Sequence, residues 1–159
     1  MSVSLNIVLA TLILLNYANT FLSFDQLRSD KPLVHKITNK SKKELYCIDA
    51  EVLRSPPITS PLPLMAEHHT MVKERDRCRV YKLLLQPGET VTVSYPFFYL
   101  SIVLKGSRIK TTIGGMSPHS ITYEKSTVLG DEAWCSPTLD VTITNVGNST
   151  FEQFIAEWR

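Results

Sequence analysis

Few of the side chains that could do chemistry stand at spacings that would bring them together. The adjacent His68 and His69 would point to opposite sides of an extended chain, so a metal site is not expected there. His119, the nearby Ser117 and Ser120, and the more distant Asp131 have the residue types of a hydrolytic triad, but nothing in the sequence fixes their geometry. These residues therefore do not predict an active site.

The three cysteines, Cys47, Cys78 and Cys135, cannot all pair within one chain, and none stands at CxxC spacing. A zinc knuckle and a dithiol redox motif are therefore not expected. One disulfide with one free thiol and three free buried thiols both remain open, and the second is favoured. Cys135 is the best candidate for a nucleophile, but the sequence identifies no base beside it.

Composition indicates an ordinary folded protein. The chain has 159 residues, of which 43% are hydrophobic and 20% charged, a balance typical of a folded globular chain of about one domain. Its net charge of +2 offers no electrostatic footprint for nucleic acid, so no nucleic-acid partner is expected.

The first twenty residues have the pattern of a signal peptide. Their apolar stretch, residues 5–15, is too short to span a bilayer comfortably, and Ala18 and Thr20 suit the positions that signal peptidase reads. Residues 1–20 are thus predicted to direct secretion and to leave no stable membrane span after cleavage. The alternative is an unrelated apolar segment that replaced earlier strands, which would place the protein in a plastid or the cytosol.

Two sequons would matter in a secretory compartment. They begin at Asn39 and Asn148, which makes both residues glycosylation candidates. Asn148 is the better acceptor because Gly147 before it favours an exposed turn.

From residue 79 onward the pattern is that of β-structure. Short apolar or alternating runs are bounded by Gly, Pro or Asn and predict strands at 80–85, 91–95, 99–105, 107–113, 121–125, 139–144 and 151–158. Strands of this length and spacing predict an all-β sandwich or barrel. Residues 53–76 form a proline-rich connector, whose last part, including 69–75, is predicted to be a loop or a single turn.

A segment before the connector repeats the end of the chain. With an offset of 106 residues and no gap, residues 24–52 match residues 130–158 at seven of 29 positions. The identities include Ile37-Thr38-Asn39 on Ile143-Thr144-Asn145. Self-similarity of this kind indicates a duplicated unit. Residues 21–52 are therefore predicted to be the closing hairpin of a partial repeat, followed by the connector and a complete domain at 77–159.

The runs RVYKLLLQPGE, LGDEAW and TNVGNSTFEQFIAEWR together resemble the cupin superfamily, and the chain is similar to uncharacterised plant proteins with two cupin domains. The resemblance implies a jelly-roll β-barrel at 77–159, often dimeric, preceded by the β-hairpin of a truncated first cupin. Many cupins hold a metal ion in the mouth of the barrel.

The resemblance also locates the family's metal ligands, and this chain replaces all four. Ser94 and Pro96 stand at the positions of the His-x-His pair, and Val141 at the second-half histidine. The glutamate position falls on Leu100, or on Ser101 or Tyr99 if the spacing is counted differently. Divalent transition metals need several imidazole or carboxylate donors, which these residues do not supply. No metal site and no cofactor are therefore expected. His35 keeps one His-x3-Asn spacing in the partial repeat, without partners for it.

Alternation in a barrel strand predicts which residues line its interior. If Ser94 and Pro96 point inward, so does Thr92, and the facing strands contribute an apolar set: Leu100, Ile102, Leu104, Leu139, Val141 and Ile143. The candidate pocket residues at the mouth are Tyr95, Phe97, Tyr99 and Trp134, with Phe98 beside them. A filled core with a dimer interface and a dry pocket for an apolar or aromatic ligand both fit this pattern, and the first is favoured.

The sequence thus predicts a non-catalytic cupin-fold protein with a structural or small-ligand-binding role, and a possible homodimer. Two enzymatic alternatives stay open. A metal-free isomerase or epimerase would need an inward acid–base residue, for which only Tyr99 is placed. A metal enzyme would need unconventional ligands.

Overall fold

The computed structural model describes residues 10–16, 19–24, 38, 40, 42, 46–51, 62–75 and 78–158. The chain divides into two compact units, Met1–Ser55 and Pro56–Arg159. Among the described residues no helix is long and apolar enough to cross a membrane.

The first unit contains a three-stranded antiparallel sheet. Its strands are β1 (Ala10–Asn16), β2 (Asn19–Phe24) and β3 (Tyr46–Glu51), in the order β2-β1-β3. Of the predicted signal peptide, residues 10–16 form β1 and residues 19–20 begin β2, whereas residues 1–9, 17 and 18 are outside the described part. Its cleavage stays a prediction. β3 corresponds to residues 152–157 by the 106-residue offset, whereas His35 and Asn39 lie outside the described residues.

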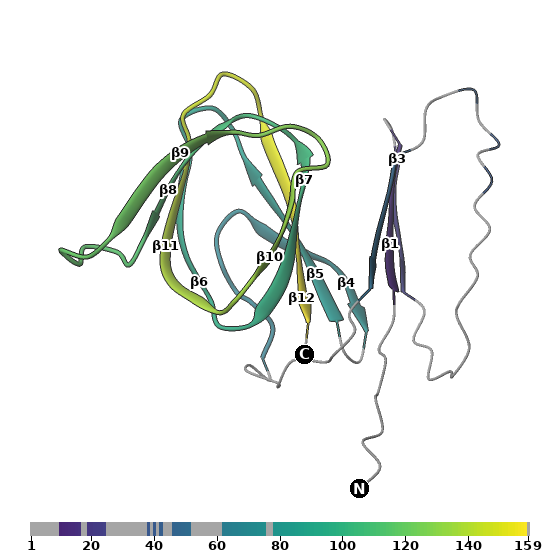
Figure 1. Cartoon of the computed structure of the whole chain (residues 1–159), viewed down its shortest axis with the longest axis horizontal. Helices are drawn as coiled ribbons and strands as arrows, with labels where there is room; N and C mark the ends of the chain where they lie inside the picture. The colour runs from purple at the N-terminus through teal and green to yellow at the C-terminus, as the bar shows by residue number, and fades with distance from the viewer. Residues whose placement is uncertain are drawn as a thin grey trace, which may run out of the picture. The chain divides into compact units, whose positions relative to one another are not determined.

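The second unit is a jelly roll made of two facing antiparallel sheets (Figure 1). The five-stranded sheet has the order β10-β7-β12-β5-β4, with bounds Glu132–Cys135, Phe98–Lys105, Phe151–Trp158, Cys78–Leu85 and His69–Arg75. The four-stranded sheet has the order β6-β11-β8-β9, with bounds Thr90–Tyr95, Thr138–Asn145, Arg108–Ile113 and Ile121–Ser126. The all-β jelly roll is as predicted, but no strand pairing in the described residues closes the two sheets into a barrel.

Two strands depart from the sequence prediction. Residues 69–75, predicted to be a loop or a single turn, form edge strand β4, which pairs with β5. This prediction was wrong because the segment exposes most of its side chains and so lacks an alternating apolar pattern. The four-residue β10 was also missed, since it is short and pairs only with β7.

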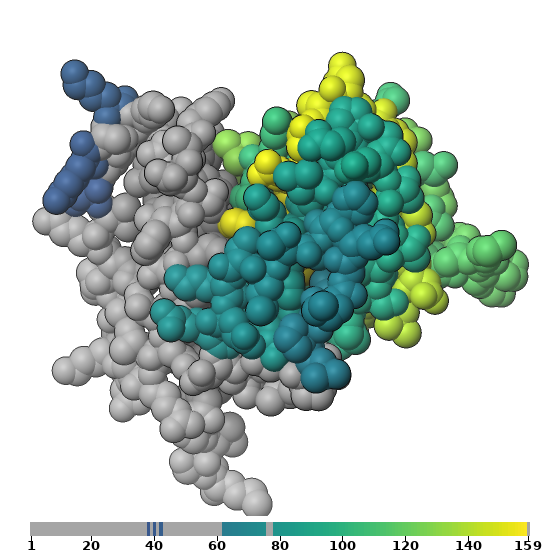
Figure 2. Space-filling model, turned by 180° about the vertical axis from the view of Figure 1, so that it is seen from behind, coloured from purple at the N-terminus to yellow at the C-terminus, as the bar shows by residue number. Residues whose placement is uncertain are grey.

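The core lies between the sheets. Apolar side chains from both sheets pack there, among them Leu83 and Ile155 on one side and Val93 and Ile143 on the other. The turn between β8 and β9 projects from this body (Figure 1, Figure 2), and Met116 at its tip is fully exposed. The core is therefore confined to the body of the jelly roll.

Candidate functional site

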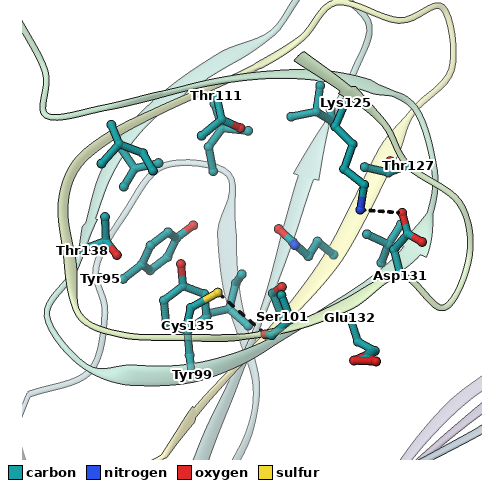
Figure 3. Close-up of a pocket in the computed structure, with 18 of the residues that line it drawn as sticks. Tyr95, Tyr99, Ser101, Thr111, Lys125, Thr127, Asp131, Glu132, Cys135 and Thr138 are labelled. Atoms are coloured by element: carbon teal, nitrogen blue, oxygen red, sulfur yellow. Dashed lines mark hydrogen bonds and ion pairs between the residues drawn. The ribbon is translucent and has the colours of Figure 1, made fainter. Parts of the chain in front are cut away.

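A cavity of about 370 Å³ remains between the two sheets (Figure 3). Aliphatic side chains form much of its wall, and hydroxyl, amide and thiol groups interrupt them. The lining residues that matter below are Tyr95, Tyr99, Ser101, Thr111, Lys125 and Cys135, together with Gln153 and the aliphatic Val103, Ile109, Val141, Ile143 and Ile155. A largely apolar wall with a few polar groups is typical of a small-molecule site.

On β6 and β7, the residues whose side chains face the cavity lie one position away from the residues predicted to face inward. On β6 the core residues are Val91, Val93 and Tyr95, whereas Thr92 is exposed and bonds to Thr142 of the neighbouring strand. On β7 the residues lining the cavity are Tyr99, Ser101 and Val103, in place of the predicted Leu100, Ile102 and Leu104. The inward set on these strands was wrong because it followed the spacing of the cupin motif. The alternation within TVTVSY itself places the valines on the buried side.

On β11 the prediction holds for Val141 and Ile143, which line the cavity, but Leu139 is 61% exposed. The register between β11 and β6 shifts between Thr138 and Val141. Asp140 has a φ of 52° and donates its backbone N–H to Ser94 Oγ over 3.1 Å. This β-bulge turns Leu139 away from the cavity.

His69 reaches the interior from the start of β4. It pairs with Leu83, whose side chain is in the core, so its ring lies on the inner face of the sheet. His68 before it has a φ of 59°, the left-handed region, and the His68 carbonyl accepts from the N–H of Leu84 over 3.1 Å. This backbone conformation orients His69 inward.

The His69 ring bonds at both nitrogens. Nδ1 lies 2.7 Å from the Glu67 carbonyl oxygen, and Nε2 lies 2.8 Å from the hydroxyl of Tyr95. The two rings meet edge to face. Burial lowers the pKa of His69, so the neutral ring is favoured.

Tyr95 and Tyr99 form the aromatic side of the cavity, with ring centroids 4.9 Å apart. Tyr95 is 1% exposed and Tyr99 is 8% exposed. Burial is the main cause that raises the pKa of both phenols, and nearby Cys135 raises them further. Both hydroxyls are therefore protonated at neutral pH.

On the side where β9 and β10 are the outer strands of separate sheets, the cavity wall is polar. Lys125 Nζ lies 3.2 Å from Asp131 Oδ2, and Figure 3 shows this ion pair at the edge of the cavity. The N–H of Val128 and then Lys125 hold the pKa of Asp131 below its usual value. The charge of Lys125 is thus engaged by a carboxylate.

Comparison with known proteins identifies the fold. No family model matches the sequence, and no curated protein matches it. A cupin domain from Bordetella pertussis Tohama I matches the structure with a TM-score of 0.50 and 13% identity, covering 59% of this chain and 93% of that one. The chain has a cupin fold.

Two further solved structures are similar to this chain with lower TM-scores. A cupin-family protein from Methanocaldococcus jannaschii is 13% identical, with a TM-score of 0.44, over 62% of this chain and 93% of that one. Oxalate oxidase is 16% identical, with a TM-score of 0.40, over 50% of this chain and 40% of that one. Identities this low assign no activity to this chain.

The residues at the cupin metal-ligand positions do not fit a metal ion. Ser94 is engaged with the backbone of Asp140, Pro96 and Leu100 have no donor atom in their side chains, and Val141 is a buried aliphatic residue. Across the described residues, no group of three or more His, Cys, Asp and Glu side chains could hold a metal ion.

Of the four predicted pocket residues, two line the cavity and two do not. Tyr95 and Tyr99 line the cavity, while Phe97 is buried behind them with its ring 6.1 Å from each. Trp134 is 48% exposed and stacks on Phe98 outside the cavity lining. Of the glycosylation candidates, Asn148 is exposed.

Sequence reasoning missed the role of His69. It was considered only as half of an improbable metal pair, because the segment around it was interpreted as a loop. An edge-strand assignment for 69–75 would have put His69 and Met71 on one face and Thr70 on the other. The long-range pairing with Tyr95 has no signal in a single sequence.

Proposed function

We propose that this chain is a non-catalytic binding protein that holds a small, uncharged organic molecule between the two sheets of its jelly roll. The observation that carries the proposal is the cavity of about 370 Å³ with its mixed apolar and polar wall. At about 30 Å³ per water molecule in the liquid, this space corresponds to on the order of a dozen waters. A ligand with one aromatic or aliphatic ring is of the right size.

The charges around the cavity favour a neutral ligand. Lys125 is paired with Asp131, and the third charged lining residue, Glu132, is exposed. An ionised ligand entering the apolar interior would lose its hydration without gaining a counter-charge, which is costly. Burial of an apolar ring against Val103, Ile143 and their neighbours supplies the affinity.

Filling the cavity tests this proposal. Thr111→Phe puts an aromatic ring into the space, whereas Lys110→Phe on the same strand puts the same ring on the exposed outer face. Saturation-transfer NMR with a library of neutral monocyclic compounds should give hits for the wild type and for Lys110→Phe. The hits should disappear for Thr111→Phe, with unchanged circular dichroism. Absence of any wild-type hit, or equal binding to both variants, contradicts the proposal.

A metal-free enzyme is the second candidate, and one observation favours it. Tyr99 faces inward, is buried and pairs across the sheet with Cys135, whose thiol also lines the cavity. A phenol in a water-poor cavity can act as a general acid. Incubation of any bound compound in D2O, followed by proton NMR, distinguishes the two candidates. Incorporation of deuterium at carbon that Tyr99→Phe abolishes would establish an enzyme, and an unchanged ligand supports the binding protein.

Secretion and pairing into a homodimer belong to the same proposal. The exposed position of Asn148 in its turn supports the glycosylation expected of a secreted chain. Expression in a eukaryotic secretory host, with and without Asn148→Gln, tests this through the loss of an endoglycosidase-sensitive mass. Sedimentation of the purified protein gives the oligomeric state.

A further inference from the structure

The proton positions on His69 follow from its two partners. The Glu67 carbonyl oxygen can only accept a hydrogen bond, so Nδ1 of His69, 2.7 Å away, carries the proton. In a neutral ring Nε2 is then bare and accepts. The hydroxyl of Tyr95, 2.8 Å from Nε2, must be the donor. The single proton of Tyr95 is thereby directed at His69.

This arrangement decides whether the Tyr95 hydroxyl donates or accepts a hydrogen bond on the cavity side. Figure 3 shows the Tyr95 hydroxyl directed into the space between the sheets. Since its proton is engaged by His69, the oxygen offers the cavity only a lone pair. Tyr95 is therefore an acceptor there, although an isolated phenol could also donate.

Tyr99 lies beside Tyr95, with the two ring centroids 4.9 Å apart. The thiol of Cys135 also lines the cavity, and it donates its one proton to the Ala133 carbonyl oxygen, 3.7 Å away. The sulfur of Cys135 therefore has only lone pairs free for a ligand.

A further polar group lies beside Tyr99, two residues along β7 on the same face of the strand. Ser101 is 9% exposed, lines the cavity, and has no hydrogen-bond partner for its side chain among the described residues. Gln153 lines the same wall, on the strand next to Ser101. The hydroxyl of Ser101 is therefore available to a polar group of a ligand in the cavity.

We propose that His69 fixes the hydroxyl proton of Tyr95, so that the cavity selects a neutral ligand that donates a hydrogen bond, such as a phenol or an alcohol on an apolar ring. The inference rests on the proposed binding function and adds the chemical class of ligand. Carboxylates and phosphates are disfavoured because they would place acceptors against acceptors. His69 acts through Tyr95 and is a positioning residue.

A pair of probes that differ only in the donor tests the ligand class. Phenol and anisole have the same ring, but methylation removes the hydroxyl proton. Titrations followed by NMR should show phenol binding the wild type about three- to tenfold more tightly than anisole, the range expected for one hydrogen bond. Tyr95→Phe should remove this preference while both probes still bind, and exposed His119→Phe should leave it unchanged.

Replacement of His69 should change Tyr95 from a hydrogen-bond acceptor to a donor toward the ligand. In His69→Phe the Tyr95 proton is free to turn into the cavity, so acetophenone, which only accepts, should bind several-fold more tightly than to the wild type. A change that only loosened the fold would weaken all three probes together. A gain for acetophenone is therefore specific to the proposed role.

A second measurement on the wild type is independent of ligand binding. Long-range proton–nitrogen NMR of the His69 ring should show a protonated Nδ1 and a bare Nε2 near neutral pH. A protonated Nε2 overturns the inference. Equal binding of phenol and anisole overturns it too, but leaves the proposed function standing. If neither probe binds and Nε2 is bare, the binding function fails, and the ligand class fails with it.

Discussion

The hydroxyl of Tyr95 and Nε2 of His69, 2.8 Å apart, join the two sheets across one side of the jelly roll. His69 begins β4 and Tyr95 ends β6, and these are the outer strands of their sheets on that side. On the other side, the ion pair between Lys125 of β9 and Asp131, just before β10, stands in the corresponding place. Among the described residues, each side that lacks strand pairing is thus spanned by a polar link.

The link through His69 predicts a loss of stability in acid. Burial lowers the folded-state pKa of His69 below its ordinary 6.5, so between these two values the unfolded chain binds a proton that the folded chain does not. The stabilisation is fully present above pH 6.5 and is lost as the pH falls through the folded-state pKa. Urea unfolding between pH 8 and pH 4.5 should show the decline.

A matched pair of variants assigns this decline to His69. His69→Phe should have a flatter pH dependence over the same interval, because the group that titrates is gone. His119→Gln removes an exposed imidazole and should retain the wild-type slope. If both variants reduce the pH dependence of the free energy of unfolding by the same amount, His69 is not the source of this dependence.

Tyr81 predicts a loss at the opposite end of the pH scale. Its hydroxyl donates to Glu157 Oε2 over 2.7 Å and accepts from the N–H of Leu64 over 3.0 Å. Burial is the main cause that raises the pKa of Tyr81 to about 12, whereas in the unfolded chain it is about 10. Between these values only the unfolded chain releases the proton, so the free energy of unfolding should fall as the pH rises.

Tyr81→Phe should remove both hydrogen bonds and cost about 1–3 kcal/mol at neutral pH, as expected when buried polar groups lose a partner. It should also reduce the alkaline slope, measured by chemical unfolding between pH 9 and pH 11. Tyr123→Phe, at a tyrosine that is 47% exposed, is the control and should change little. A neutral effect of Tyr81→Phe would mean that these bonds do not stabilise the fold.

How well the sequence predicts each strand depends on how many of the strand's faces are buried. Strands with one buried face and a clear alternation, such as β6 and β11, were found with their approximate ends. β7 has apolar residues on both faces, so Tyr99 and Ser101 could not be told from Leu100 and Ile102 by period alone. Polar edge strand β4 has no such pattern at all.

The site was less predictable than the fold, because its defining contacts are long-range. Tyr95 and Tyr99 were identified from their aromatic character. The partner of Tyr95, in contrast, is 26 residues away on a strand that sequence reasoning missed. The bulge at Asp140 also depends on pairing with a neighbouring strand, and so the exposure of Leu139 could not be foreseen.

Asn145 provides a third prediction, on the packing that holds the cavity walls together. Its side chain is fully buried and Nδ2 donates to the carbonyl oxygens of Leu85 and Ser149 over 3.0 and 2.8 Å. Oδ1 accepts from Ser107 Oγ over 2.8 Å and from the N–H of Gly147 over 3.1 Å. Four bonds thus join β11 to β5 and to two loops.

Asn145→Asp keeps the shape of this side chain but removes both donors. A carboxylate oxygen would then face two carbonyl oxygens in a buried site, so the free energy of unfolding should fall by about 3 kcal/mol or more at pH 7. Asn148→Asp, three residues along in an exposed position, should change it by less than about 0.5 kcal/mol. The pKa of the introduced carboxyl should be raised, because only its protonated form can donate to a carbonyl. Part of the lost stability should therefore return as the pH falls toward 5, and a loss that is the same at pH 7 and pH 5 would contradict this account of Asn145.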